Sequence, residues 1–416
     1  MSTGMAFGHG LRDRWPLDPA IVYLNHGTVG AAPHDVLRVQ QTLRDRMARQ
    51  PSQFLLRDVT HALSGLSGGS AVGTATNEPT LVRAAARQVA SFVGAASDDV
   101  VFVDNATSGV NTVLRAVPLA SGDEILTTDQ SYGAVMNAMR FVAARRGATV
   151  KVVEAPYSRF DADELVERID RAIGPRTRLL VVDHVTSSTA LVLPVAAIAE
   201  RCRARGVTVL VDGAHAPGAI PLDVPSLGVD YYTGNLHKWA QAPQTAALLW
   251  AAPLRQDGLH PLVISWELGH GFTSEFDMVG TRDLTPWLAA PAGLRFLADL
   301  GFADVCRWNH DLAWQAGQLL AARWGTRLEV PESSVGTMIA VPAPSRFAGD
   351  AATASRLRDA LLFTHGIEVH VYAALGHVWI RVSAQVYNER TDVERLADAV
   401  LALSRMVVFG CEAHGG

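Results

Sequence analysis

The chain has 416 residues, of which 49% are hydrophobic and 19% charged, so it is long enough to bury a large core and to form two or three domains. Its formal charge is −5 and it carries no basic tract that would follow a phosphate backbone, which argues against a nucleic-acid partner. No apolar stretch reaches the ~18 residues of a spanning helix, and the start of the chain lacks a signal-peptide pattern, so we expect a cytoplasmic protein without a membrane partner.

The cysteines are few and widely spaced. They are Cys202, Cys306 and Cys411, an odd number. This pattern argues against a disulfide framework and against a paired-cysteine metal site, and it fits a reducing compartment.

The N-terminal residues 1–59 are predicted to form a segment that joins the small domain described below to the active site. Within it, the stretch 50–59 is a candidate lining of the substrate pocket. Arg57 would there meet a distal carboxylate of the substrate, or else lie at a solvated helix end.

Short β-rich runs then alternate with helical patterns. The runs occupy 98–104, 123–129, 149–155, 178–185 and 208–215. They are continuously apolar, which is typical of parallel strands covered on both faces. We therefore predict a three-layer, mostly parallel α/β domain over residues 60–285. The Gly/Ser/Thr-rich stretch 64–80 within it is predicted to be a flexible loop.

The pattern changes near Pro286. Two helical stretches are followed by an apolar run, a helix that begins near Ala351, and two closely spaced apolar runs at 367–374 and 377–384. This order predicts a smaller C-terminal α+β domain with antiparallel pairing over residues 286–416.

Polar residues gather where the predicted parallel strands end, which is where such sheets bind ligands. Asp129 to Tyr132 and Asp183-His184 are two of these ends. A third is VDNATSGV, in which Thr107 and Ser108 follow a strand and open a helix. Each is explained by ordinary helix capping when taken alone. Together they favour a site, and the helix start at Thr107 suits a single small phosphate.

The stretch LVDGAHAPG places Asp212 at the end of an apolar strand, where an unpaired carboxylate would be costly. A protonated pyridine nitrogen would be a suitable partner. Gly213 and Ala214 leave room for a flat ring, and His215 is placed to reach a ring substituent. The alternative is a carboxylate that caps the next turn.

Lys238, in TGNLHKW, is one of only two lysines among 36 basic residues; the other is Lys151, inside a predicted strand. Arginine stays protonated, whereas a lysine in a pocket can lose its proton and attack an aldehyde. We therefore expect Lys238 to perform chemistry that arginine cannot. A phosphate loop, a pyridine-facing aspartate and an imine-forming lysine in this order indicate pyridoxal 5′-phosphate (PLP) as the cofactor.

The motifs VDGAHAPG and TGNLHKW, with YLNHGTVG near the start, resemble class V, fold-type I PLP enzymes, and among them the isopenicillin N epimerase-like branch. By this resemblance Lys238 binds the cofactor aldehyde, Asp212 pairs with the pyridine nitrogen and His215 approaches the phenolic oxygen. The remaining cofactor contacts that it implies are Ala106, Thr107, Asn235 and His237 at the phosphate, Tyr132 stacked on the ring, and Thr186 and Ser187 at the phenolic oxygen. It also implies a homodimer with shared sites, in which Thr281 reaches the partner subunit's phosphate.

Substrate recognition requires an anion-binding group. The resemblance assigns the α-carboxylate of an amino-acid substrate to Arg381, through a bidentate pair. Asn25 and His26 would lie near the same carboxylate, with Tyr372 close by. The alternative for Arg381 is a structural ion pair.

The reaction type is left open by the fold and the cofactor. The resemblance implies Cα chemistry through an external aldimine, with epimerisation in secondary metabolism first and C–S lyase, aminotransferase and decarboxylating deaminase as rivals. Epimerisation needs a second acid/base, for which Tyr372, His370 and His26 are candidates. Cysteine desulfurases carry a nucleophilic cysteine just before the strand with the arginine, but this chain has none there, so persulfide chemistry is not expected.

Two other functional classes compete with PLP chemistry. A zinc hydrolase could use a set of histidines and carboxylates at strand ends, but it leaves the lysine unexplained. That set comprises Asp183, His184, Asp212, His215 and His237. A PLP-fold regulator would need a DNA-binding module, and the chain has no additional basic domain.

Overall fold

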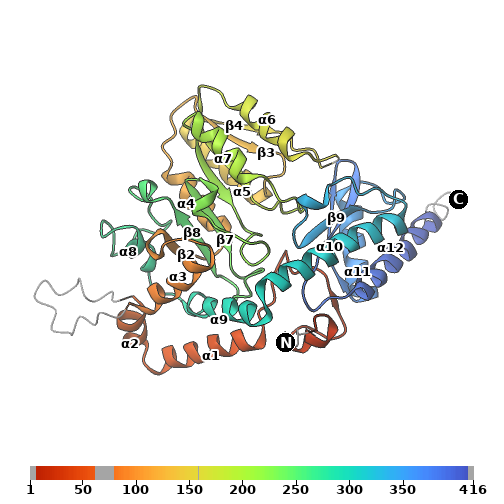
Figure 1. The fold of residues 1–416 in the computed structure, drawn as a ribbon, viewed down its shortest axis with the longest axis horizontal. Coiled ribbons are helices and arrows are strands. Elements are labelled where there is room, and N and C mark those ends of the chain that lie inside the picture. Colours follow the sequence, from red (N-terminus) through yellow and green to blue (C-terminus); the bar gives the residue numbers. More distant parts are fainter. Residues whose placement is uncertain (1–5, 61–78, 158, 411–416) are drawn as a thin grey trace, which may run out of the picture.

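The computed structural model describes residues 6–60, 79–157 and 159–410. Most of the predicted loop 64–80 therefore lies outside the described residues, as does Cys411. A seven-stranded sheet forms the centre of the larger part of the molecule (Figure 1). Its strands, in spatial order, are β2 (Val100–Val103), β8 (Ala247–Ala251), β7 (Tyr231–Asn235), β6 (Thr208–Asp212), β5 (Thr177–Asp183), β3 (Glu124–Thr128) and β4 (Thr149–Val153).

Only β8 runs antiparallel to its neighbours in this sheet. Alternate residues of the buried strands join different hydrophobic clusters: Val209 and Val211 of β6 lie in one cluster and Leu210 lies in the other. The apolar runs are thus continuous because both faces are covered, as predicted. The predicted α/β class with a mostly parallel sheet is confirmed.

Helices cover the two faces. The side chains of α4 (Ala106–Ala116) and α5 (Gly133–Arg146) pack on the face of Leu210. The opposite face is covered by α3 (Leu81–Phe92), α6 (Ala162–Ala172) and α7 (Val195–Ala204), and α7 contains the buried, free Cys202. A short helix, α8 (Phe272–Asp277), follows the long loop after β8.

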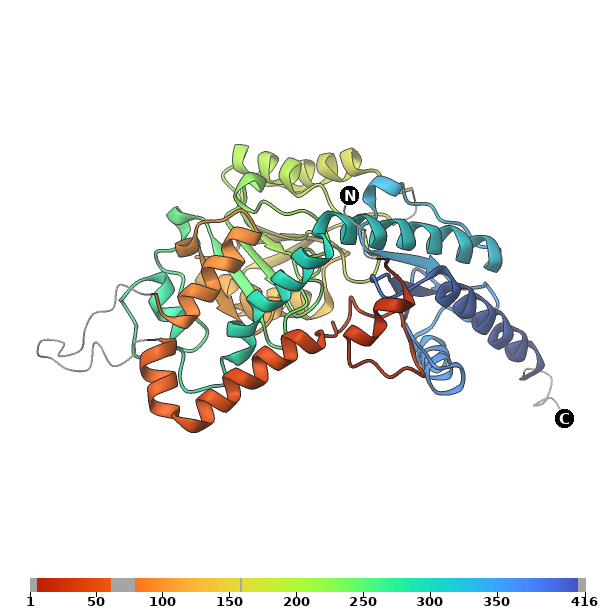
Figure 2. The same cartoon turned by 60° about the horizontal axis from the view of Figure 1, so that its bottom comes forward.

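A smaller antiparallel sheet lies beside the large one. Its order is β11 (His370–Ala374), β12 (His377–Ser383) and β9 (Met338–Pro342). Its helices are α10 (Phe302–Trp324), α11 (Ala351–His365) and α12 (Arg390–Gly410), so the predicted start at Ala351 and the antiparallel pairing are both observed. Helix α9 (Thr285–Leu300) packs on α1 (His34–Arg49) and α3 and leads into α10 (Figure 2).

The N-terminal segment is joined to the smaller sheet region. Strand β1 (Val22–Tyr23) pairs with β10 (Ile367–Glu368), and the backbone N–H of Ser383 donates to the carbonyl of Leu24 over 2.8 Å. Residues 50–59 form α2 (Pro51–Gln53) and a π-helical turn (Phe54–Val59) at the far end of α1. The exact division into domains stays a prediction. No helix in the described part of the chain is long and apolar enough to cross a membrane.

Candidate active site

The carboxyl ends of β5 and β6 place two acids side by side. Asp183 and Asp212 are register partners on adjacent parallel strands, and both are almost fully buried. Burial raises the pKa of Asp212, and burial together with the charge of Asp212 raises the pKa of Asp183 well above its usual range. Two like charges this close disfavour each other, so we assign the negative charge to Asp212 and a neutral carboxyl to Asp183.

Asp212 is held by few protein groups. One carboxylate oxygen accepts from the backbone N–H of Ala214 at 3.0 Å, and the positive charge of Lys238 lowers its pKa. A cationic ligand group at this carboxylate would further offset the cost of its burial. The missing side chain of Gly213 makes room for Tyr232 and not for such a ligand, because a Cβ on Gly213 would lie 2.3 Å from the Tyr232 ring. Its small size is therefore required by packing behind the site.

Lys238 follows β7 in a buried loop. Its Nζ lies 3.1 Å from Nε2 of His215. Burial and, next, the charge of Arg381 lower the pKa of Lys238 to about 7, although the Asp212 carboxylate opposes this shift. Near neutral pH the Lys238 amine is therefore unprotonated in a large share of the molecules, and this is the state that attacks an aldehyde.

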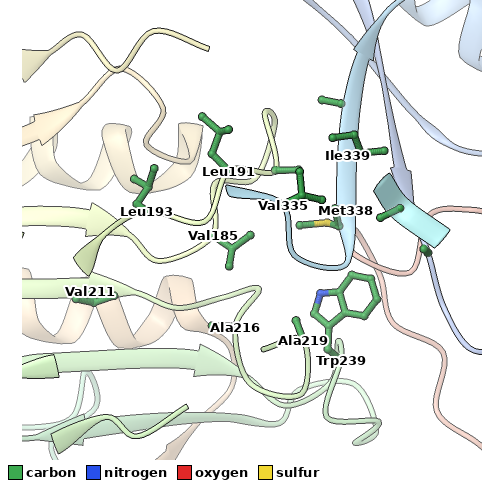
Figure 3. Packing of buried hydrophobic residues seen from close by; sticks show 14 of the residues in the cluster. Val185, Leu191, Leu193, Val211, Ala216, Ala219, Trp239, Val335, Met338 and Ile339 are labelled. Atoms are coloured by element: carbon green, nitrogen blue, oxygen red, sulfur yellow. The ribbon is translucent and has the colours of Figure 1, made fainter. Parts of the chain in front are cut away.

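The backbone around Lys238 is fixed from both sides. The indole of Trp239 is buried and lies below Met338 of β9, with Ala219 nearby (Figure 3). Gly30 packs so closely that a Cβ there would stand 2.7 Å from the Cα of Lys238. The loop that carries the amine is thus packed between β9 of the small sheet and the N-terminal segment.

His215 has an unpaired nitrogen. Burial, and then the charge of Lys238, lower its pKa well below the usual value, so the ring is neutral. Its buried Nδ1 has no hydrogen-bond partner among the described residues. An unpaired buried polar atom costs about 1–3 kcal/mol, which a ligand with a polar oxygen or nitrogen would offset. The site is therefore built to receive one.

The predicted phosphate-binding residues lie around the start of α4. The side chain of Asn235 accepts from the backbone N–H of Ala106 at 2.8 Å, which joins β7 to the helix start. His237 Nδ1 donates to the carbonyl of Ala246 at 2.9 Å, so its Nε2 points elsewhere. No hydrogen bond engages the half-buried side chain of Thr107 within the described part of the chain. These groups fit a small phosphate at the helix N-terminus.

Two residues predicted to contact the cofactor ring differ in whether their side chains are free to bind it. The side chain of Tyr132 precedes α5 and is 46% exposed, free to stack on a ligand. The hydroxyl of Thr186 is buried and engaged: it bonds the Thr189 hydroxyl at 2.7 Å and accepts from Leu191 N–H at 2.8 Å. Of the two neighbours, half-buried Ser187 is better placed to offer its hydroxyl.

Arg381, on β12, is 1% exposed and has no carboxylate partner in the described residues. It donates to Thr28 Oγ1 at 2.6 Å and to the carbonyl of Ser187, and its Nε lacks a partner there. Burial lowers its pKa to about 10, so it stays charged. A buried guanidinium without an anion is suited to bind one, and the structural ion pair considered as the alternative is not observed.

The other predicted substrate contacts are engaged by protein groups. Asn25 Nδ2 donates to Glu368 at 2.7 Å, and its buried Oδ1 has no partner in the described chain. The Tyr372 hydroxyl donates to the carbonyl of Ser188 at 2.9 Å. His26 is fully buried, with Nε2 3.0 Å from the carbonyl of Lys238 and Nδ1 2.9 Å from the Tyr387 hydroxyl. Since a carbonyl only accepts, Nε2 carries the proton and both ring nitrogens are used.

Two further candidates lie at the periphery. Thr281 is exposed, and its neighbour Arg282 pairs with Asp104 and stacks 4.4 Å over the Trp287 ring. Arg57 is exposed on the π-helical turn. Their contacts to a partner subunit or a substrate stay predictions.

The zinc hypothesis is not supported by the geometry. No group of three or more histidine, cysteine or acidic side chains in the described residues is arranged to hold a metal ion. His184, one of the proposed ligands, instead bonds the Tyr232 hydroxyl at 2.9 Å.

Sequence reasoning missed Thr28 and Tyr387. Thr28 binds Arg381, and Tyr387 fixes the ring of His26. Thr28 belongs to the YLNHGTVG motif, so the motif itself was the available signal. No sequence signal pointed to Tyr387, because its partner His26 lies 361 positions away in the chain.

A family model described as aminotransferase class-V matches residues 59–396. The chain belongs to this family. It is 33% identical to isopenicillin N epimerase of Streptomyces clavuligerus, over 94% of this chain and 97% of the relative. It is 31% identical to a probable chloroplastic L-cysteine desulfhydrase of Arabidopsis thaliana, over 93% of this chain and 84% of that protein.

Solved structures show the same fold. A C-DES mutant with glycine covalently linked to its PLP cofactor superposes with a TM-score of 0.75 at 21% identity, covering 94% of this chain and 98% of that one. The cysteine desulfurase of Thermococcus onnurineus NA1 superposes with a TM-score of 0.77 at 19% identity, covering 97% and 99%. The chain is thus a fold-type I, PLP-dependent class V enzyme, and the predicted family and cofactor are confirmed.

Proposed function

We propose that this protein is a PLP-dependent amino-acid epimerase that acts at Cα. The observation that carries the proposal is the half-buried Lys238 amine, 3.1 Å from Nε2 of His215 and with its pKa lowered to about 7, which interacts electrostatically with both the Asp212 carboxylate and the Arg381 guanidinium. An amine that can lose its proton is therefore within electrostatic reach of a site for a ring cation and of a site for a carboxylate. This is the set of groups that an amino acid bound to PLP requires.

PLP, when bound, withdraws electrons from Cα of an attached amino acid and makes its α-proton acidic. The chain's residues perform the other tasks. Asp212 would keep a positive charge at the ring nitrogen, and Thr107, Asn235 and His237 would hold the phosphate. Arg381 orients the substrate through its α-carboxylate, and the free amine of Lys238 removes or returns the α-proton.

Epimerisation is preferred because the isopenicillin N epimerases of S. clavuligerus and Amycolatopsis lactamdurans are 33% and 35% identical over 94% and 95% of this chain. The test is to incubate the holoenzyme with isopenicillin N in deuterated water. We expect inversion at one α-carbon together with uptake of solvent deuterium there, measured by chiral chromatography and NMR. Borohydride should fix PLP on Lys238, identified by peptide mass.

C–S lyase activity is the second candidate, favoured by L-cysteine desulfhydrase relatives of 29% to 32% identity that match at least 92% of this chain. The same amine would remove the α-proton, and a sulfur substituent would leave from Cβ. Sulfide, pyruvate and ammonia from L-cysteine, without inversion of isopenicillin N, would replace the epimerase assignment. The loop before β12 contains only Leu375 and Gly376, so it offers no cysteine for persulfide transfer.

We also propose a cytoplasmic homodimer. Between β8 and α8, a loop exposes several large apolar side chains, a feature typical of protein interfaces. These side chains are Leu262, Val263, Ile264, Trp266 and Leu268. The loop is ordered by buried Glu275, which accepts from His260 at 2.7 Å and from Gly269 N–H at 3.0 Å. Light scattering should give twice the chain mass for the wild type, and Trp266→Glu should shift it to the monomer; an unchanged mass in that variant would contradict this interface.

A further inference from the structure

Epimerisation requires a second proton-handling group besides Lys238, because the proton must return to the opposite face of Cα. The inference below rests on the proposed function. Sequence reasoning offered His26, Tyr372 and His370 for this role, and the structure separates them. The criterion is a ring nitrogen or hydroxyl that is near the substrate and is not already engaged by the protein.

His26 and Tyr372 fail this criterion. Both ring nitrogens of His26 are engaged, one by the carbonyl of Lys238 at 3.0 Å and one by the Tyr387 hydroxyl at 2.9 Å. The Tyr372 hydroxyl donates its proton to the carbonyl of Ser188 at 2.9 Å. Burial also raises the pKa of Tyr372, so that hydroxyl does not act as a base near neutral pH.

His370 meets it. It begins β11 and stands directly opposite Arg381 on β12, so the two side chains lie on the same face of the small sheet. Its ring stacks on Tyr372, with centroids 5.3 Å apart and planes at 24°, which fixes its orientation. Within the described residues no hydrogen bond engages either ring nitrogen of this half-buried side chain.

The charged groups around His370 include residues of the candidate site and influence its pKa. Burial, and then the charges of Arg381, Arg358 and Lys238, lower its pKa to about 3, so the ring is neutral with one nitrogen free to accept a proton. The pKa of His215 is in turn lowered in part by His370. His370 is therefore within electrostatic reach of the amine and of the guanidinium. A substrate carboxylate on Arg381 would offset part of this repulsion and make protonation of His370 easier.

We propose that His370 is the second catalytic residue and exchanges a proton with the face of the substrate Cα opposite Lys238. In each turnover one Cα–H bond breaks, its proton passes to one of the two groups, and the other group delivers a proton to the opposite face, where the same electron pair forms the new Cα–H bond. The group that acts as acid enters the turnover carrying a proton taken from water, and the group that acts as base enters it without one. The starting enantiomer decides which group plays which part. Proton exchange with water restores both groups, so no co-reactant is consumed.

Glycine is a suitable probe because its two α-hydrogens face opposite sides and no side chain is required. The holoenzyme is incubated with glycine in deuterated water, and the position of the incorporated deuterium is determined by NMR after chiral derivatisation. The wild type should exchange both hydrogens. His370→Gln should still exchange one of them within about threefold of the wild-type rate and lose exchange of the other by roughly 100-fold or more.

His377→Gln is the matched control, because His377 is an exposed histidine on the adjacent strand. It should exchange both hydrogens like the wild type. PLP absorbance and the melting temperature of both variants should match the wild type, which excludes misfolding or cofactor loss. His370→Ala gives a second test should the Gln variant be unstable.

Three results would overturn the role of His370. They are exchange of both hydrogens by the His370 variants, equal loss of both with PLP content intact, and exchange of one hydrogen or none by the wild type. The proposed function fails separately: sulfide from L-cysteine without inversion of isopenicillin N would overturn epimerisation, even if glycine showed two-sided exchange that depends on His370.

Discussion

The cofactor side and the substrate side of this site are built in different ways. On the cofactor side, Asp212 ends β6 and Lys238 lies in the loop after β7, the neighbouring strand of the same sheet, and both belong to short motifs. On the substrate side, Arg381 of β12 contacts Thr28 of the N-terminal segment and the carbonyl of Ser187 after β5. Chemistry that depends on one sheet edge is encoded locally, whereas recognition of the substrate depends on segments that only the fold brings together.

The two lysines give the largest test of this comparison. Lys238→Ala should abolish the covalent PLP adduct and reduce α-proton exchange by about 10³-fold or more, because no other amine lies in the described site. Lys151, whose exposed Nζ donates to the carbonyl of Ala172 at 2.7 Å, is the control, and Lys151→Ala should leave both unchanged. The adduct is measured by borohydride reduction and mass spectrometry. A persistent adduct in Lys238→Ala would refute the assignment.

The two acids at the sheet edge should differ almost as much. Asp212→Asn removes the negative charge that we expect to pair with the cofactor ring nitrogen, and it should slow α-proton exchange by roughly 10²-fold or more. Asp183→Asn replaces a carboxyl that its neighbour and burial keep neutral, so exchange should stay within about threefold of wild type. PLP absorbance and exchange rates are measured side by side. Equal losses in both variants would show that Asp183 carries charge.

On the substrate side, Arg381→Gln should raise KM for the amino acid by about 30-fold or more, equivalent to ~2 kcal/mol, since a buried charge partner of the carboxylate is lost. Arg381→Lys should recover only part of this affinity, because it keeps the positive charge but loses the bidentate hydrogen bonding of the guanidinium. PLP absorbance should not change in either variant. Steady-state kinetics separate the KM effect from kcat, and an unchanged KM would contradict the carboxylate assignment.

The last prediction concerns protein stability and the link between the two sides, and it involves no step of the reaction. Burial lowers the pKa of His26 from 6.5 to about 4, so the folded protein resists protonation that the unfolded chain accepts. The contribution of this group to stability is therefore complete above pH ~6.5 and falls by about 3 kcal/mol as the pH drops towards 4. His26→Gln should show a weaker fall in the urea midpoint over this window than wild type. Parallel curves for the two proteins would contradict this.

Much of the fold followed from the pattern of residues. Continuous apolar runs such as that ending at Asp212 predicted a parallel sheet covered on both faces, and the structure has it. The antiparallel small sheet and the helix that begins at Ala351 were also predicted. Polar residues at strand ends predicted a cofactor side at one edge of the sheet, and Asp183 and Asp212 do lie side by side there, because parallel strands bring their carboxyl ends to one edge.

Other contacts could not be predicted. Gly213 suggested room for a ring, but the structure shows that Tyr232 occupies the space beside it. His26 suggested a substrate contact, whereas its two nitrogens hold the Lys238 backbone and Tyr387. In both cases the deciding neighbour comes from another segment, and no local spacing reports it.

The sequence by itself determined the cofactor class, because one of only two lysines, an aspartate at a strand end and a helix start for a phosphate each carry their chemistry in a few adjacent residues. Only the tertiary structure decided which groups are free to react. Whether a histidine nitrogen or a tyrosine hydroxyl is available depends on distant hydrogen-bond partners, and whether a carboxyl is charged depends on burial and on the charge beside it.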